Sequence, residues 1–79
     1  MSTLAVQTDA MATGVEFTAD DLHVRLADGR VVSVPLMWFP ALRDANETQR
    51  ANFRLIGGGV GIHWPDLDED ISVEGLLAI

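Results

Sequence analysis

The stretch LHVRLADGRVVSV, residues 22–34, carries the strongest indication of the fold. Leu22, Val24 and Leu26 alternate with polar residues, as in a strand that has one apolar face. A second alternating run follows after the turn-forming residues Asp28 and Gly29. The segment therefore predicts an antiparallel β-hairpin.

The apolar pattern also selects the register of this hairpin. A two-residue turn would pair Val24 with Ser33 and mix apolar and polar side chains on one face. A three-residue loop over 27–29 instead pairs Val24 with Val32 and Leu22 with Val34, and it places a glycine at the left-handed position that such loops need. Because a slip of one residue reverses every side chain, burial favours the three-residue loop. The outward-facing residues are then His23, Arg25 and Ser33.

Upstream of the hairpin, Val15 and Phe17 alternate with polar residues and predict a further strand. Residues 1–13 are small and polar and show no sustained period, so we expect a flexible tail. The predicted organisation is this tail followed by a single domain over 14–79.

Downstream, the sequence predicts short helices. Pro40 suits a first helical position and starts a helix over 40–45. Asn46 followed by Gln49 resembles a capping box and starts a second helix that runs to residue 51. Ser72 is a suitable cap for a C-terminal helix.

The segment between these helices is less determined. Residues 53–56 fit either a strand or the end of the second helix, the three glycines at 57–59 force a turn, and residues 61–64 resume an extended run that stops at Pro65. The predicted fold class is α+β: a small single domain in which an antiparallel, hairpin-based sheet packs with short helices.

Composition excludes several classes of protein. The 79 residues contain no cysteine and no lysine, and their net charge is −7. Disulfide scaffolds are thereby excluded, and the negative field disfavours nucleic acid and anionic membranes as partners. No apolar run approaches the roughly 20 residues of a membrane helix, and no signal peptide is evident, so we expect a cytoplasmic protein. The acidity fits a basic protein partner, although it would also serve solubility alone.

The alternating carboxylates Asp66, Asp68 and Asp70 resemble the start of a calcium loop. The resemblance ends at Ile71 and Leu77, where such a loop needs glycine and glutamate. We therefore predict no metal site and no cofactor, and interpret the segment as a structural or solvated acidic loop.

His63 lies close to these carboxylates in sequence and would suit a general base. The sequence offers no nucleophile with it, because Ser33 and Ser72 are explained as a strand residue and a helix cap, so we predict no catalytic residue.

Aromatic and acidic residues together suggest a partner-binding surface. Small cores rarely hide two tryptophans completely, and aromatic side chains are enriched at interfaces. An acidic rim beside them would steer a basic partner. The predicted surface comprises Trp38, Phe39, Trp64, Asp66, Asp68, Glu69 and Asp70; the alternative places both tryptophans in the core.

From Val15 onward the chain resembles a family of small bacterial and phage-associated proteins, domain of unknown function 2442. The resemblance rests on LADGRVVSVPLMWFPAL (26–42) and on QRANFRLIGGGVGIHWPDLDEDISVEGLL (49–77). It implies a small α+β fold, no established catalytic residue, and antitoxin-like or regulatory roles, because members occur beside toxin genes or fused to helix-turn-helix domains. Ala41 and Val60 stand where the resemblance leads us to expect arginine and glutamate.

Three functions remain open. The first is a non-enzymatic protein-binding module, antitoxin-like or regulatory, whose partner is a basic protein. The second is an acidic phage-type inhibitor, similar to an anti-CRISPR decoy, that blocks a nucleic-acid-binding groove of a larger complex. The third is a small hydrolase or ligand-binding protein that uses His63. The sequence fixes neither the partner nor the oligomeric state.

Overall fold

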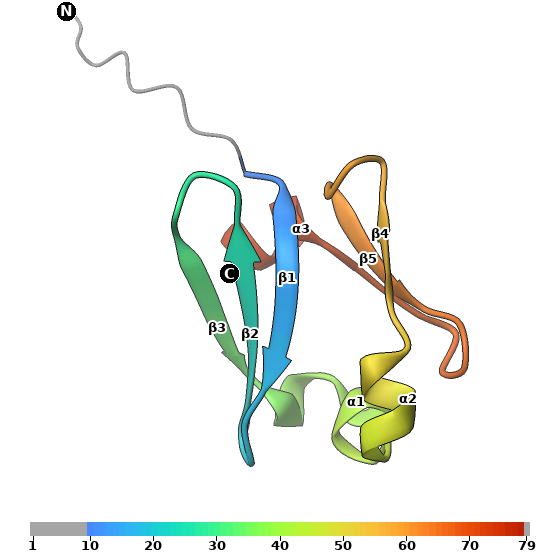
Figure 1. The fold of residues 1–79 in the computed structure, drawn as a ribbon. Coiled ribbons are helices and arrows are strands. Elements are labelled where there is room, and N and C mark those ends of the chain that lie inside the picture. The colour runs from blue at the N-terminus through green and yellow to red at the C-terminus, as the bar shows by residue number, and fades with distance from the viewer. Residues whose placement is uncertain (1–9, 79) are drawn as a thin grey trace, which may run out of the picture.

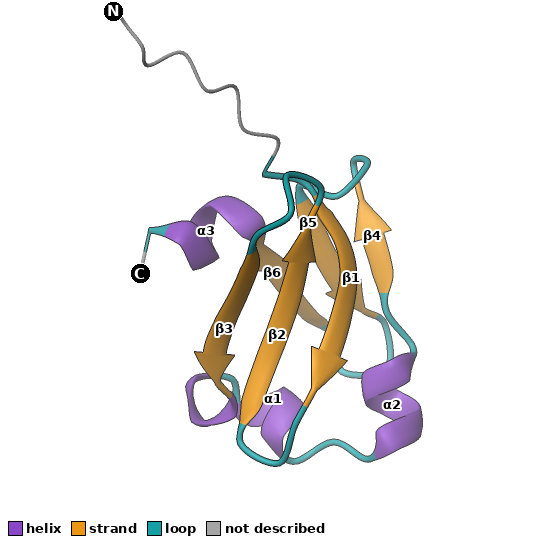
Figure 2. Cartoon of the chain, turned by 60° about the vertical axis from the view of Figure 1, so that its left-hand side comes forward, coloured by secondary structure: helices purple, strands orange, loops and turns teal. Residues whose placement is uncertain are grey.

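Six short strands form two antiparallel sheets in the computed structural model, which describes residues 10–78. The first sheet contains β1 (Ala12–Phe17), β2 (Asp21–Leu26) and β3 (Val31–Pro35), in that order. The second contains β4 (Arg54–Ile56), β5 (Gly61–Trp64) and β6 (Glu69–Ser72). Figure 2 shows the first sheet in front of the second, so the core lies between them.

Four short helical segments complete the domain. A 3₁₀ turn, η1 (Leu36–Trp38), leads from β3 into α1 (Pro40–Arg43) and α2 (Glu47–Ala51), which lie together at one end of the molecule (Figure 1). The last element, α3 (Val73–Leu77), follows β6 directly and contacts β3. The predicted α+β class is confirmed. The arrangement differs from the expected single sheet, because the second half of the chain forms a sheet of its own.

The predicted hairpin register is confirmed. Val24 pairs with Val32 and Leu22 with Val34 across β2 and β3. The loop over 27–29 closes with a hydrogen bond from the Leu26 N–H to the Arg30 carbonyl at 2.9 Å. Its third residue, a glycine, has a φ of 95°. Leu22, Val24 and Val34 are buried, and Val32 packs against the core while partly exposed.

The first strand begins at Ala12, three residues before the predicted start at Val15. A bulge between Ala12 and Gly14 shifts the pairing with β2, and this irregularity hides the early strand residues from a search for strict alternation. Of the predicted tail over 1–13, residues 1–9 lie outside the described part of the chain.

Helix signals in the sequence are also confirmed. Pro40 occupies the start of α1, and Asn46 and Gln49 form a reciprocal capping box at α2. The hydroxyl of Ser72 accepts a hydrogen bond from the Gly75 N–H at 2.9 Å and caps α3. Residues 54–56 are a strand, which resolves the alternative between strand and helix end.

Side chains from both sheets and from the helices form one core. Trp64 lies at its centre, with the ring centroids of Phe17 and Phe53 at 6.3 and 6.2 Å. Its indole Nε1 donates a hydrogen bond to the Arg50 carbonyl at 3.0 Å. The buried apolar residues are Ala12, Leu22, Val24, Leu26, Val34, Leu36, Leu42, Ile62, Trp64, Ile71, Val73 and Leu76.

The glycine turn at 57–59 joins β4 to β5 and contacts the first sheet through Ala12. All three residues have positive φ angles, and the carbonyl of Gly59 accepts a hydrogen bond from the Ala12 N–H at 2.7 Å. A Cβ at Gly59 would lie 2.4 Å from the Ala12 carbonyl oxygen. The close approach of the two backbones therefore requires glycine at this position.

Candidate partner-binding surface

The acidic segment forms the turn of the β5–β6 hairpin and the start of β6. Asp66 and Asp68 lie exposed in the turn, where Asp68 has a φ of 50°. Asp66 also accepts a hydrogen bond from the Asn52 side chain at 3.0 Å, which ties the turn to the residue after α2. Glu69 and Asp70 belong to β6 rather than to a loop. The hairpin thus holds four carboxylates on a short, well-defined structure.

These carboxylates are not neutralised by arginine. Three of the five arginines bind acidic residues elsewhere, in the pairs Arg25–Glu16, Arg30–Asp28 and Arg43–Asp44. Within residues 10–78, no arginine forms an ion pair with the carboxylates of the hairpin; His63 alone pairs with one of them. The hairpin therefore holds a local group of carboxylates with which no described arginine pairs.

Two of the arginine pairs shift the pKa of their partners. A side-chain hydrogen bond from Arg30 lowers the pKa of Asp28, and one from Arg43 lowers the pKa of Asp44. Both carboxylates thus stay charged to lower pH than they otherwise would.

His63 faces away from the core on β5 and engages Asp70 directly. The two residues are cross-strand partners, and His63 Nδ1 lies 2.5 Å from Asp70 Oδ1. Arg54 is opposite His63 on the other neighbouring strand, so Arg54, His63 and Asp70 lie in one row across this sheet. The Ser72 hydroxyl is occupied as the cap of α3. This arrangement explains His63 as a structural cross-strand contact.

No group of three metal-ligating side chains comes together within the described chain. The one departure from the expected acidic loop is that half of it is a strand.

The predicted aromatic residues have different environments. The prediction that Trp64 lies on the partner-binding surface is wrong, because its side chain is 0% exposed and fills the centre of the core. Trp38 is 49% exposed and follows Met37, which is 70% exposed. Phe39 is partly buried and packs against the core. Of the three predicted aromatic residues, Trp38 is therefore the exposed one, and the neighbouring Met37, which was not predicted, extends its apolar surface.

The acidic hairpin and the η1 turn lie apart. In Figure 1, η1 follows the lower end of β3, whereas the β5–β6 turn lies beyond α1 and α2. The residues predicted to form one surface thus form two exposed groups. The spacing of sequence motifs alone gave no sign of this separation.

A groove that the sequence did not indicate lies between β1 and α2. It encloses about 550 Å³, and its apolar walls include Val15, Phe17 and Phe53. Glu47 and Arg50 of α2 line the same groove. Its position follows from the fold, because β1 is the outer strand of the first sheet and α2 precedes the outer strand of the second.

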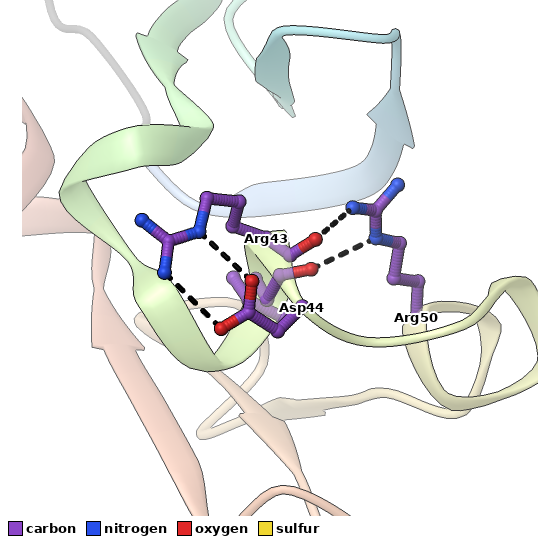
Figure 3. Close-up of polar contacts among 4 residues, drawn as sticks. Arg43, Asp44 and Arg50 are labelled. Carbon is purple, nitrogen blue, oxygen red and sulfur yellow. Dashed lines mark hydrogen bonds and ion pairs between the residues drawn. The ribbon is translucent and has the colours of Figure 1, made fainter.

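Arg50 holds this region together. Its Nε donates to the Leu42 carbonyl and a terminal nitrogen donates to the Arg43 carbonyl, both at 2.9 Å, so that the guanidinium caps the end of α1 (Figure 3). The guanidinium carbon also lies 5.2 Å from the centroid of the Phe17 ring. These contacts fix the Arg50 side chain within the protein, and no local motif in the sequence indicates them.

The hydrogen bond between His23 and Ser33, which spans 2.6 Å across β2 and β3, was also not predicted from the sequence. Glu16 is the cross-strand neighbour of His23 on β1, but its carboxylate binds Arg25. Neither His23 nor Ser33 lines the groove described above. The row is therefore a polar ladder on the outer face of the sheet.

A further hollow, of about 760 Å³, lies beside α3 and includes Met11, Val60 and Leu77. It adjoins both limits of the described chain. No helix within residues 10–78 has the length and apolar character needed to cross a membrane.

Comparison with known proteins identifies a family and a fold. A family model described as a protein of unknown function, DUF2442, matches residues 12–79. No curated protein matches the chain.

Two solved structures resemble this fold. The first is a protein of unknown function from Rhodospirillum rubrum, with a TM-score of 0.71 and 28% identity, covering 86% of this chain and 84% of its own. The second is an uncharacterized protein from Chromobacterium violaceum, with a TM-score of 0.71 and 23% identity, covering 86% of this chain and 64% of its own. Both likenesses concern the fold.

Proposed function

This chain belongs to the DUF2442 family, and on that premise we propose that it is a non-enzymatic protein-binding module of the cytoplasm, an antitoxin-like or regulatory partner of a basic protein. One observation carries the proposal: Asp66, Asp68 and Glu69 stand on a hairpin whose carboxylates no described arginine neutralises. Such a group of charges attracts a basic surface during diffusion and orients it before contact.

The exposed Met37 and Trp38 supply a second, apolar contact. Tryptophan and methionine are enriched at protein interfaces, where a large apolar side chain anchors the complex. Because η1 and the acidic hairpin lie apart, a partner that used both would have to reach around the end of the molecule that holds α1 and α2 (Figure 1). A small basic partner would instead use the hairpin alone.

A second candidate is an acidic inhibitor of phage type that occupies the nucleic-acid-binding groove of a larger complex. The observation that favours it is the net charge of −7 together with the complete lack of lysine, which resembles the charge of the nucleic acid that such a decoy would displace. The neighbouring genes distinguish the two candidates: a short basic reading frame favours the antitoxin-like role, and a phage cassette favours the inhibitor.

The test begins with affinity capture of the partner from the host, followed by association kinetics at several salt concentrations. The informative variant combines Asp66→Asn, Asp68→Asn and Glu69→Gln, since asparagine at position 66 keeps an acceptor for Asn52. We expect association at low salt to slow by at least about tenfold, with a weaker dependence on salt.

The matched control combines Asp20→Asn, Asp21→Asn and Glu74→Gln, which removes the same number of charges elsewhere. This control should slow association much less. Equal effects of the two triple variants, with both proteins folded, would show that only the net charge matters and that the hairpin is not the binding surface.

A further inference from the structure

The outer edge of β1 presents backbone groups that are free to pair. The Thr18 N–H donates a backbone hydrogen bond to the Asp21 carbonyl at 2.9 Å, at the end of the β1–β2 hairpin. Because bonded and non-bonded pairs alternate along an antiparallel ladder, Glu16 and Gly14 bond to β2, whereas the N–H and C=O groups of Val15 and Phe17 point away from it. Among residues 10–78, no backbone or side-chain partner occupies these outward groups.

This free edge faces the groove between β1 and α2. Figure 2 shows β1 at the margin of the front sheet, next to α2. The groove combines unpaired strand groups with the apolar side chains of Phe17 and Phe53. An extended peptide could therefore hydrogen-bond to β1 while its inward side chains contact these rings, as in other cases of strand addition.

The net charge of −7 attracts a basic peptide to this protein, and the groove offers such a peptide one carboxylate. Glu47 is exposed, and no described arginine pairs with it. The guanidinium of Arg50 also lines the groove, where two backbone carbonyls and the Phe17 ring fix its position but leave its charge in place. The Glu16 carboxylate binds Arg25, so Glu47 is the carboxylate of the groove that no described arginine pairs with. An incoming lysine or arginine would thus find Glu47 available.

We propose that this groove binds an extended, basic segment of the partner protein, which adds to β1 as a fourth strand of the first sheet. This inference rests on the proposed function and names the mode by which that partner is bound. The segment would form backbone hydrogen bonds with Val15 and Phe17 and direct a basic side chain to Glu47.

The test uses a defined probe, a seven-residue blocked peptide of alternating lysine and valine, titrated into ¹⁵N-labelled protein. Saturable shifts should concentrate at residues 14–18 and 47–53, and the Val15 and Phe17 amides should exchange more slowly with solvent. A second peptide, identical except for N-methylated valines, keeps the charge but loses backbone donors. It should bind at least tenfold more weakly.

Two proline variants form the matched pair on the protein. Val15→Pro removes an outward N–H of β1 without removing a bond to β2, since proline is tolerated on edge strands. Val31→Pro makes the same change on the outer edge of β3, where Val31 is also a non-bonded partner of β2. Val15→Pro should weaken peptide binding at least tenfold, and Val31→Pro should leave it unchanged.

Equal binding of the N-methylated peptide would overturn the proposal, because it would show attraction by charge alone. That comparison uses the unaltered protein and decides the question even when Val15→Pro does not fold. Dimerisation through β1, detected by sedimentation, would also overturn it by assigning the edge to a second copy of this chain. If the hairpin triple variant slows association with the captured partner while Val15→Pro leaves that affinity intact, the proposed function stands and this inference fails.

Discussion

Replacement of Arg50 provides a quantitative test of how the helices are attached to the core. The guanidinium donates two hydrogen bonds to the end of α1 and lies over Phe17 (Figure 3). Hydrogen bonds from charged groups contribute about 1.5–3 kcal/mol when buried, and half-exposure reduces this to about 1 kcal/mol each. Stacking on an aromatic ring adds about 0.5–1 kcal/mol.

We therefore expect Arg50→Ala to lower the free energy of unfolding by about 2.5 kcal/mol. For a domain of this size that corresponds to a fall in Tm of about 10–20 °C. Arg50→Lys keeps the charge, but an ammonium group cannot reach both carbonyls as the planar guanidinium does. About half of the loss in the free energy of unfolding should therefore remain. Urea unfolding followed by circular dichroism measures both changes, and the m-value shows whether unfolding stays two-state.

Arg43→Ala is the control, because Arg43 forms an exposed pair with Asp44 and only its backbone carbonyl contacts Arg50. Surface pairs of this kind contribute little, so its unfolding midpoint should match that of the parent protein. Salt should weaken the Arg43 pair without removing the contribution of Arg50. The reasoning is refuted if Arg50→Ala is no more destabilising than Arg43→Ala.

Four further predictions follow from individual contacts. Gly59→Ala should destabilise the domain by at least about 2 kcal/mol, because its Cβ would meet the Ala12 backbone at a φ of 121°, whereas Gly14→Ala, with nothing within 4 Å, should be neutral in the same urea assay. Trp64→Ala should cost about 3–5 kcal/mol of stability, and Trp38→Ala less than about 1 kcal/mol; equal losses would contradict their different burial. Calorimetric titration with calcium, magnesium and zinc should show no binding tighter than about 100 μM, and micromolar affinity lost in Asp68→Ala would reverse this expectation. In an NMR titration, the Asp28 carboxyl should show a pKa below its ordinary 3.8, and this pKa should return to normal in Arg30→Gln. The contribution of the Asp28–Arg30 pair to stability is present above pH 3.8 and disappears as the pH falls through the lowered pKa. An unshifted pKa of Asp28 in the parent protein would contradict the pair.

Local patterns predicted much of the fold because each of them depends on residues that are close together in the sequence. The register of β2 and β3 follows from which side chains must be buried together, and the caps of α2 and α3 follow from side chains that satisfy neighbouring backbone groups. In contrast, β6 begins with Glu69 and Asp70, which are poor strand formers. It exists because Ile71 pairs with Ile62 and completes the core between the sheets.

The candidate site was less predictable because it depends on contacts between distant residues. Composition identified the acidic segment, but it did not show that the segment forms a hairpin, and it could not distinguish Trp64 from Trp38. Their difference arises from the packing of Phe17 and Phe53 around Trp64 and from its hydrogen bond to the Arg50 carbonyl. The groove beside β1 likewise exists only after two sheets have been placed against each other.

Long-range contacts at the two ends of β1 also explain why this groove stays open. At one end, the Ala12 N–H binds the Gly59 carbonyl; at the other, Phe17 packs against Arg50 and Trp64. Both ends of β1 are therefore fixed to the second half of the chain, while the outward backbone groups of Val15 lie between them without a partner in the described chain. A strand held at both ends cannot shift to pair with β4 without breaking these contacts. The edge of β1 is thus preorganised, so this protein would lose little conformational entropy when a segment binds to it.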